Sequence, residues 1–226
     1  MSLARLKALP RSRAATKEFR RQQLIDSTID SIAKRGFADT TLADVAEGAG
    51  LSRGIVNFHF QSKDQLLVET LQVLADEYRD NWQKALRKAG GSPIERLVAL
   101  VAADFEPAVC NRKKIAVWFA FWGEAKSRPT YLKLCADRDQ EYAEMMRGVC
   151  AAVIAEGPYP QLALERLVNG IGALTDGLWL DFLVDPKTTD REGAKSITLL
   201  FLAGLLPKHL EPDGRIKILE PTPHDH

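Results

Sequence analysis

The amino-acid sequence predicts an all-α protein. Apolar residues recur at three- and four-residue spacing along most of the 226 residues, and breaks containing glycine or proline separate these stretches. No segment alternates apolar and polar residues convincingly over the length of a β-strand. With 46% hydrophobic and 27% charged residues, the composition is that of a globular protein with one large domain, or with one small and one medium domain.

The first helix is predicted between Glu18 and Gly36. Its apolar residues at helical spacing are Leu24, Ile25, Ile29, Ile32 and Ala33. Gly36 stands where the end of a helix favours a left-handed residue. We expect residues 1–19 to be a basic, flexible arm and residues 20–66 to form the first domain.

Two short helices are predicted next, joined by a turn at Gly50. Thr41 with Asp44 three residues later is typical of a helix start. Ser52 is expected to cap the following helix, which runs to about Phe60. The apolar residues of both helices can pack on the first helix, so the sequence predicts a three-helix unit.

A long amphipathic helix is predicted from a capping box at Ser62 and Gln65 towards Trp82. It leads into a second domain, residues 67–206, which is also helical. The breaks within that domain are KAGGSP at 88–93, Pro107, the residues 127–129, GPYP at 157–160 and the residues 185–186. The remaining residues, 207–226, are rich in proline and are expected to be a mobile tail.

Charge is distributed unevenly, although the formal net charge is only +1. Residues 1–25 hold seven Arg or Lys and one acid, whereas residues 68–226 hold 20 basic and 23 acidic residues. A basic front end is typical of a protein that meets a polyanion, and a solvated, disordered tail has the same composition. Charge alone leaves both possibilities open.

Two short helices that join at a tight turn and pack on a third form a helix-turn-helix, whose second helix lies in the major groove of DNA. An ordinary helical hairpin has the same outline. In the DNA-binding interpretation, Arg53 can make a bidentate contact to guanine and Asn57 to adenine, and Lys63 suits a phosphate at a helix N-terminus. The candidate DNA contacts are Thr41, Ser52, Arg53, Gly54, Asn57, His59 and Lys63.

The stretch TLADVAEGAGLSRGIVNFHFQSKDQLL, residues 41–67, resembles the N-terminal domain of the TetR family of transcriptional repressors. The family pattern reads Ser-x-Gly-x-x-Tyr-x-Tyr/His-Phe-x-x-Lys-Glu-x-Leu. Here the corresponding residues are Ser52, Gly54, Asn57, His59, Phe60, Lys63, Asp64 and Leu66. Asn57 replaces a tyrosine that often contacts backbone phosphate in the family, so that contact is not carried over. Asp64 conserves the charge of the glutamate that it replaces.

The resemblance implies an Ω-shaped homodimer with two all-α domains in each subunit. Its C-terminal domains pair through their last two helices, and a ligand there changes the separation of the two recognition helices. A symmetric dimer implies a near-palindromic operator in double-stranded DNA. The pairing helices would be residues 161–183 and 190–206, with the apolar residues Leu162, Leu167, Ile171, Leu174, Leu178, Ile197, Leu200 and Phe201.

Two aromatic clusters mark the second domain as a candidate ligand site. Trp118 and Trp122 share a helix face, with Phe121 adjacent to it. Trp179 in turn shares a face with Asp176. Aromatic rings with a nearby acid suit a quaternary ammonium, because the ring quadrupole attracts a cation that has no hydrogen-bond donor. Aromatic residues at this spacing also form ordinary cores, and Asp176 could equally be an interface or capping acid.

Within the TetR family, the segments VWFAFW, DGLWL and LIDSTIDSI resemble the choline-responsive repressors of glycine betaine synthesis. The resemblance implies a repressor of betaine-synthesis genes that choline releases from its operator. The alternative is a repressor of the same family that senses another apolar or aromatic ligand, such as a drug or an acyl compound.

An enzyme is not expected. No histidine forms a pair with a carboxylate of the kind used in metal or triad chemistry, and the chain has no P-loop and no GxGxxG motif. We therefore expect no catalytic residue, no metal and no cofactor. Cys110, Cys135 and Cys150 lack metal-binding spacing and are expected to be reduced, buried or half-buried thiols.

A cytoplasmic protein without a membrane span is expected. The longest apolar run, ITLLFLAGLL at 197–206, has half the length that a bilayer requires. The N-terminus lacks the apolar stretch of a secretory signal. Binding of the basic segment to a membrane surface is the less favoured alternative, because the segment contains Pro10 and no sustained amphipathic pattern.

Overall fold

The computed structural model describes residues 13–157, 159 and 162–217. This part of the chain is helical, and its one β-type feature is an isolated bridge between Leu210 and Ile216. The helices are α1 (Arg13–Arg35), α2 (Leu42–Gly48), α3 (Arg53–His59), α4 (Lys63–Lys88), α5 (Pro93–Asp104), α6 (Arg112–Ala125), α7 (Pro129–Glu156), α8 (Leu164–Val184) and α9 (Arg191–Leu205). The predicted all-α fold is confirmed.

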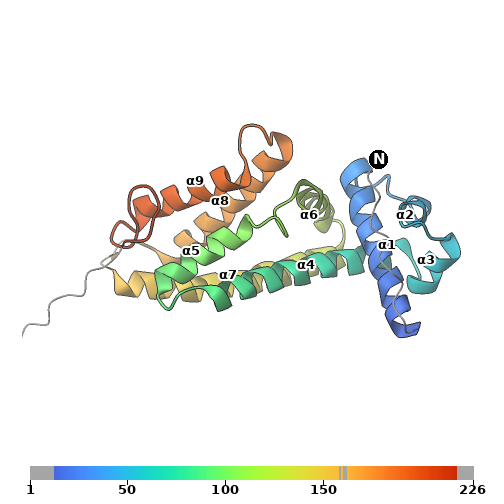
Figure 1. Ribbon diagram of the computed structural model, residues 1–226, viewed down its shortest axis with the longest axis horizontal. Helices are drawn as coiled ribbons and strands as arrows, with labels where there is room; N and C mark the ends of the chain where they lie inside the picture. The colour runs from blue at the N-terminus through green and yellow to red at the C-terminus, as the bar shows by residue number, and fades with distance from the viewer. Residues whose placement is uncertain (1–12, 158, 160–161, 218–226) are drawn as a thin grey trace, which may run out of the picture.

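The helices form two bodies at opposite ends of an elongated molecule (Figure 1). A small body contains α1, α2 and α3, and a larger body contains α5 to α9. α4 extends from the small body into the larger one, where it packs against α5 and α7. The boundary expected between residues 66 and 67 therefore lies within one continuous helix, near its N-terminal end.

Buried apolar side chains hold the small body together. Leu24 and Ile25 of α1 are fully buried, as are Val45 of α2 and Val56 of α3. The hydroxyl of Ser27 donates a hydrogen bond of 2.8 Å to the carbonyl of Val45, which ties α1 to α2. Because every helix contributes to one core, the relative positions of α2 and α3 are fixed.

Two glycines end helices in the small body. Gly36 has φ +85° and Gly50 has φ +65°, conformations that glycine adopts without steric cost. After α2, the N–H of Leu51 donates to the carbonyl of Ala46 over 2.9 Å, which is the long bond of a Schellman turn. The left-handed residue at position 50 thus sets the angle at which α3 leaves α2.

Side-chain caps fix the helix starts that the sequence predicts at Thr41 and Ser62. Thr41 and Asp44 form a reciprocal capping box. Ser62 accepts a hydrogen bond from the N–H of Gln65, while the side chain of Gln65 accepts one from the N–H of Gln61. The predicted capping box at Ser62 therefore forms in part: the side chain of Gln65 accepts from the N–H of Gln61 and not from that of Ser62.

Two predictions about the ends of the chain need correction. α1 begins at Arg13, so residues 13–19 of the expected flexible arm are helical, because they continue the first helix. Residues 207–217 of the expected mobile tail pack on the protein, since Leu210 is buried and the ring of His209 bonds to the hydroxyl of Tyr159 over 2.7 Å. Residues 1–12 and 218–226 lie outside the described residues.

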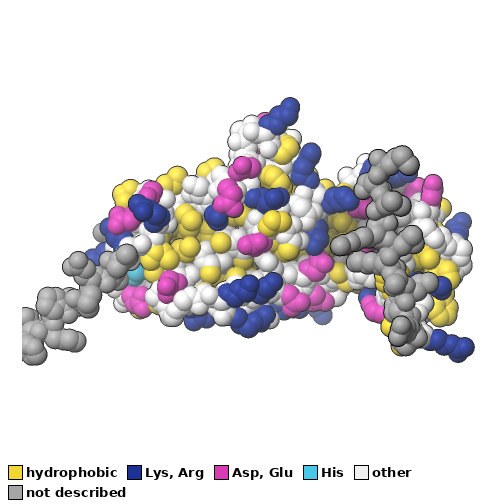
Figure 2. Space-filling view, viewed as in Figure 1, with side chains coloured by type: hydrophobic (Ala, Val, Ile, Leu, Met, Phe, Trp, Pro, Cys, Tyr) yellow, Lys and Arg dark blue, Asp and Glu magenta, His cyan; other side chains and the backbone are white. Residues whose placement is uncertain are grey.

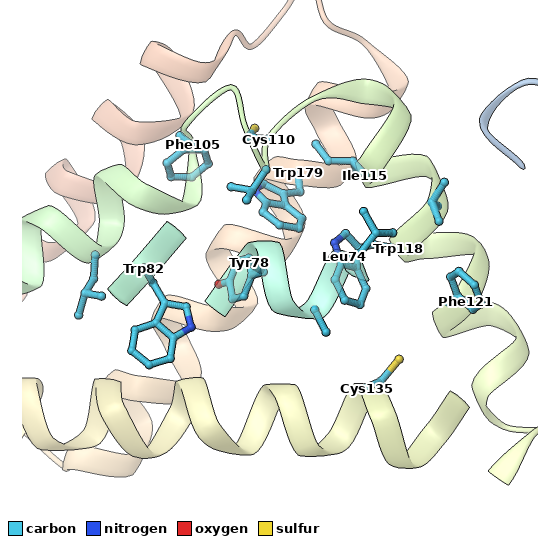
Figure 3. Close-up of a cluster of buried hydrophobic side chains, with 14 of the residues drawn as sticks. Leu74, Tyr78, Trp82, Phe105, Cys110, Ile115, Trp118, Phe121, Cys135 and Trp179 are labelled. Atoms are coloured by element: carbon cyan, nitrogen blue, oxygen red, sulfur yellow. The ribbon is translucent and has the colours of Figure 1, made fainter. Parts of the chain in front are cut away.

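The larger body encloses an extended apolar core (Figure 3). Trp82, Tyr78 and Leu74 lie along α4 in this core, and Trp179 of α8 approaches Tyr78. The three cysteines are buried free thiols, in line with the prediction, and burial raises the pKa of Cys110 and Cys150 to about 12. Such thiols are poor nucleophiles at neutral pH.

α8 is the one helix in the described residues whose length and composition would allow it to cross a membrane, and 39% of its apolar window is buried. It packs against α6, α7 and α9 on one side. Its other side exposes the apolar residues Ala173, Leu180 and Val184. α8 therefore has one apolar face in the core and a second apolar face outside it, and these two faces together give it the apolar composition of a membrane-spanning helix.

Candidate functional site

The first candidate site is the outer face of α3. Ser52, Arg53, Gly54 and Asn57 are exposed there, whereas Val56 is fully buried. The burial of Val56 against α1 and α2 decides which side of α3 faces outward. The structure thus brings these four predicted residues together on one open surface.

Thr41 and Ser52, two of the predicted DNA contacts, differ in whether their hydroxyl groups are used in helix caps. The hydroxyl of Thr41 donates to Asp44 over 2.6 Å and accepts from the N–H of the same residue, so it is used in the cap of α2. Ser52 stands at the N-cap position of α3, but its side chain makes no capping bond. The prediction that Ser52 caps α3 is wrong in this respect, because solvent can satisfy the exposed first N–H groups of this short helix.

Gly54 and Lys63 complete the predicted set along this face. A Cβ atom at Gly54 would meet only the hydroxyl of Ser52, at 3.7 Å, so no contact within the chain requires glycine there. Lys63 lies in the first turn of α4, and its ammonium group reaches the carbonyl of Ala38 at 3.4 Å. A phosphate would have to replace this long, exposed hydrogen bond.

His59 ends α3 beside a group of cations on α1. Its pKa is lowered, first by burial and then by the positive charges of Lys17, Arg20 and Arg21, while Glu18 acts in the opposite direction. His59, Lys17 and Arg20 line a shallow surface hollow together with Arg13 and the exposed ring of Phe58. In the space-filling view, basic and apolar side chains adjoin at this end of the molecule (Figure 2).

The second candidate site is a cavity of about 330 Å³ in the larger body. Its lining includes Tyr78 of α4, Asp104 of α5, Tyr142 of α7 and most of the residues between Val168 and Asp176 of α8. Asp104 is 1% exposed, which places a carboxyl group inside an apolar body. A buried acid among aromatic rings is the chemistry expected for binding a cation.

Hydrogen bonds hold the carboxyl group of Asp104 in place. The hydroxyl of Tyr78 donates to one oxygen over 2.8 Å, and the hydroxyl of Tyr142 donates to the other over 2.9 Å. The indole N–H of Trp179 donates to the backbone carbonyl of Asp104 over 2.9 Å. Burial, followed by the charge of Asp104, raises the pKa of Tyr142 well above its ordinary value, so the phenol remains a donor.

Aromatic rings surround this carboxyl group. Tyr78 meets Tyr142 edge to face with ring centroids 5.3 Å apart, and Trp179 at 6.1 Å. Trp82 meets Tyr142 at 6.3 Å. We call Tyr78, Trp82, Asp104, Tyr142 and Trp179 the Asp104 cluster. Its members come from four helices that are separated in sequence.

The five predicted ligand residues do not form one site. Asp176 is exposed and lines the same cavity as Asp104, and Trp179 belongs to the Asp104 cluster. Trp118 and Trp122 are neighbours, with ring centroids 6.3 Å apart, as their spacing predicts. Phe121 instead packs on Phe37 and Tyr131, closer to the small body. Figure 3 shows Trp118 beside Leu74 and Phe121 further from Trp179.

Sequence reasoning missed Asp104, Tyr78 and Tyr142. A signal for Asp104 was present, since it is the single acid after Glu95 in the run RLVALVAADF, which otherwise predicts a buried helix. An acid on a buried face is a candidate functional group. Tyr78 and Tyr142 lie in charged stretches, so nothing in the local pattern indicates that they meet.

Within the part of the chain that the structure describes, no group of three or more His, Cys, Asp or Glu could hold a metal ion. Polar groups of the cavity are instead suited to a small organic ligand. Besides Asp104 and Asp176, the hydroxyl of Thr175 is buried there and has no hydrogen-bond partner within the described residues. Such a hydroxyl can serve a polar group of a ligand.

Family models match most of the chain. Residues 24–70 match the model described as "Bacterial regulatory proteins, tetR family". Residues 93–207 match "BetI-type transcriptional repressor, C-terminal". The chain is 35% identical over 181 residues to the HTH-type transcriptional regulator BetI of Paraburkholderia xenovorans (strain LB400), which covers 79% of this chain and 89% of the relative.

Two solved structures have the same fold. A putative transcriptional regulator from Pseudomonas aeruginosa PAO1 superimposes with a TM-score of 0.74 at 26% identity, over 84% of this chain and 91% of that one. A putative transcriptional regulator from Saccharomonospora viridis, solved in complex with choline, superimposes with a TM-score of 0.73 at 22% identity, over 82% and 96% of the two chains.

Proposed function

Because this chain belongs to the BetI-type repressors of the tetR family of bacterial regulatory proteins, we propose that choline or a related quaternary ammonium is the ligand that releases it from DNA. It is a transcriptional regulator and not an enzyme. The proposal concerns the ligand, the regulated genes of betaine synthesis and the residues at both sites. Such a repressor acts where the bacterial chromosome lies, in the cytoplasm.

On the DNA side, the outer face of α3 is the proposed recognition surface. Arg53 is exposed at the start of this helix and Asn57 one turn later, so both are free to meet base edges. Ser52 and Lys63 are proposed phosphate contacts, and Gly54 leaves room for a groove wall. Thr41 is a proposed phosphate contact that would have to exchange its hydroxyl bond to Asp44 for one to the phosphate. His59 lies beside the cations of α1 and is a proposed phosphate contact as well.

The single observation that supports a cationic ligand best is the buried Asp104 within its aromatic cluster. A trimethylammonium group has no N–H donor, so it gains from nearby negative charge and from ring faces and not from hydrogen bonds. The two tyrosine hydroxyls hold the carboxyl group in position. We assign the ammonium end of the ligand to Asp104 and its hydroxyl end to Thr175, with Asp176 at the mouth of the cavity.

A hollow at the N-terminal end of α9 also contains aromatic and acidic residues, but it suits a cation less well. The guanidinium group of Arg191 already lies over the ring of Phe182, 5.8 Å from its centroid. Glu192 there pairs with Lys195. The aromatic face of that hollow is therefore occupied by a cation of the chain itself.

The alternative ligand is an apolar or aromatic compound, such as a drug or an acyl chain. Met146, Val168 and Ile171 give the cavity the apolar wall that such a molecule needs. Against it, an apolar ligand would make no use of the carboxyl group of Asp104, whereas a cation would be attracted to it. The Saccharomonospora viridis regulator in complex with choline shares the fold, which makes choline the first ligand to test.

A homodimer is proposed through the outer faces of α8 and α9. Of the apolar residues that the sequence suggested for pairing, Leu167, Ile171 and Leu178 are buried in the subunit itself. The exposed large apolar residues on these helices are Leu180, Val184, Ile197, Leu200 and Phe201. Several exposed large apolar residues on two neighbouring helices are typical of an interface between subunits.

Fluorescence anisotropy of a labelled duplex from upstream of the gene tests the proposal, at fixed salt and with or without millimolar choline. We expect saturable binding that an unrelated duplex does not displace, and a clear loss of affinity when choline is added. Betaine, which carries a carboxylate, serves as the matched control ligand. Specific binding that choline leaves unchanged would retain the repressor and remove choline as its ligand.

A further inference from the structure

Phe58 is exposed at the end of α3, although it is a large aromatic residue. Its side chain is 70% exposed, whereas its neighbour Phe60 is 1% exposed and belongs to the core. The fold therefore does not use Phe58 for its own packing. Single exposed apolar residues are common on protein surfaces, so the position of the ring and its neighbours decide what it can do.

The ring shares a face of α3 with two residues of the proposed recognition surface. Gly54, Asn57 and Phe58 are related by helical spacing of three and four residues, so they lie side by side. Gly54 contributes no side chain, and a Cβ atom added there would meet only the hydroxyl of Ser52 at 3.7 Å. On this face the exposed backbone of Gly54 lies next to the projecting ring of Phe58. The backbone can approach DNA closely while the ring reaches the base edges in the major groove.

Cations of α1 lie beside the ring. The ammonium group of Lys17 lies 5.7 Å from the centroid of Phe58, and the hollow beside the ring is lined by Arg13, Lys17 and Arg20 of α1. His59 meets the ring edge to face, with centroids 5.2 Å apart. An apolar ring with basic groups beside it is complementary to DNA, whose phosphates flank an apolar group in the major groove, the C5-methyl of thymine.

We propose that Phe58 is a specificity-determining residue that contacts the C5-methyl group of a thymine in each half of the operator. The inference rests on the proposed function, because it requires α3 to lie in the major groove. Phe58 adds apolar readout to the hydrogen bonds assigned to Arg53 and Asn57. It matches no residue of the sequence pattern that identifies the DNA-binding domain, so it can distinguish this operator from those of relatives.

Replacement of thymine by deoxyuridine tests the assignment, since uracil lacks only the methyl group. A duplex selected from random DNA by the full-length protein is resynthesised with uracil at each thymine in turn, and its affinity is measured by anisotropy. We expect one thymine in each half-site at which uracil weakens binding roughly fourfold, the value of one buried methyl group. In Phe58→Ala, thymine and uracil at that position should bind equally.

Two further variants serve as controls. Phe58→Leu keeps an apolar side chain and should retain part of the preference for thymine. Leu132→Ala removes another exposed apolar residue, on α7, and should leave the preference unchanged. Thermal unfolding of each variant establishes that the fold is kept, as the exposure of both positions leads us to expect.

The possible results of these experiments distinguish a failure of the Phe58 assignment from a failure of the proposed function. A preferred duplex that tolerates uracil everywhere, or a uracil effect that persists in Phe58→Ala, would overturn the role of Phe58 while specific DNA binding stands. Loss of self-association in Phe58→Ala, with an undiminished uracil effect, would assign the ring to a protein contact and overturn it too. Failure to select any preferred duplex would overturn the proposed function together with this inference.

Discussion

Asp104 is an acidic residue that the fold buries, which its position in the sequence does not reveal. It ends α5, is buried in the larger body, and accepts hydrogen bonds from tyrosines of α4 and α7. A carboxyl group in such a place costs free energy unless something compensates for its charge. A cationic ligand beside this carboxyl group would add to that compensation, and its binding would then stabilise this region.

Asp104→Asn should therefore weaken choline binding at least tenfold while leaving DNA binding intact. Asparagine keeps the shape and can still bond to both tyrosines, but it removes the charge that attracts the ammonium group. Tryptophan fluorescence during choline titration measures the affinity, because Trp82 and Trp179 belong to the cluster. Asp181→Asn, which changes an exposed acid on α8, is the control. An affinity within twofold of the wild type in Asp104→Asn would refute the assignment.

His59 should make DNA binding depend on pH. Burial and the cations of α1 lower its pKa below the ordinary 6.5, so the ring is neutral in the free protein at pH 7.5. A phosphate beside it would raise the pKa, so the complex would bind more protons than the free protein and its affinity would rise as pH falls. From pH 7.5 to 6 we therefore expect the affinity for the operator to rise steadily.

The measurement is anisotropy at several pH values and constant ionic strength, with His59→Gln as the comparison. The variant should show a flatter dependence on pH, since it keeps a polar side chain without the titrating group. An identical pH dependence in the two proteins would exclude a phosphate contact at His59. His209, which is buried and bonded to Tyr159, is present in both proteins.

At the scale of elements, α8 and α9 each have two apolar faces. One face of α8 packs into the core through Leu167 and Leu178, and the opposite face leaves Leu180 and Val184 exposed. Helical periodicity shows that both faces are apolar but not which of them the subunit itself covers. The packing of α8 against α6 and α7 determines which of its two faces is buried.

Leu200→Glu should weaken self-association at least tenfold, because it places a charge in the exposed apolar face of α9. Analytical ultracentrifugation over a range of concentrations measures the effect. Leu132→Glu adds the same charge at an equally exposed apolar position on α7 and should leave association unchanged. If Leu200→Glu remains a dimer under these conditions, the proposed interface is wrong. In a monomeric variant, operator affinity should fall as well, since two half-sites are no longer bound together.

At the scale of the whole molecule, the two bodies are joined by α4, by the packing of α1 against α6, and by a contact around Arg128. The guanidinium group of Arg128 bonds to Asp64 at the start of α4 over 2.8 Å and lies over the rings of Phe37 and Tyr131. Phe37 belongs to the loop after α1, whereas Tyr131 belongs to α7. A movement of α7 at the ligand cavity thus has a direct path to the small body.

Arg128→Ala should reduce the effect of choline on DNA affinity by about 1 kcal/mol, roughly fivefold, while each ligand still binds alone. The quantity to measure is the ratio of operator affinities with and without choline. Arg147→Ala is a matched control, because Arg147 is as exposed as Arg128 and bonds to Glu165 over 2.7 Å, away from the small body. An unchanged ratio in Arg128→Ala would show that coupling takes another route.

Local chemistry allowed the sequence by itself to determine the helices, their breaks and the helix-turn-helix. Caps such as Thr41 with Asp44 and the left-handed Gly50 act within a few residues, so they can be recognised without the fold. The same holds for the outward residues of α3, because one buried position, Val56, fixes the orientation of so short a helix.

Only the tertiary structure decided where the ligand cavity lies. Tyr78, Asp104 and Tyr142 meet because α4, α5 and α7 pack together, and no spacing within one helix encodes a contact between helices. Sequence spacing grouped Trp118, Phe121 and Trp122, yet packing sends Phe121 towards Phe37 and leaves Asp176 at the cavity mouth. Burial of Asp104 is likewise a property of the assembled core, since exposure is set by all the elements that surround a side chain.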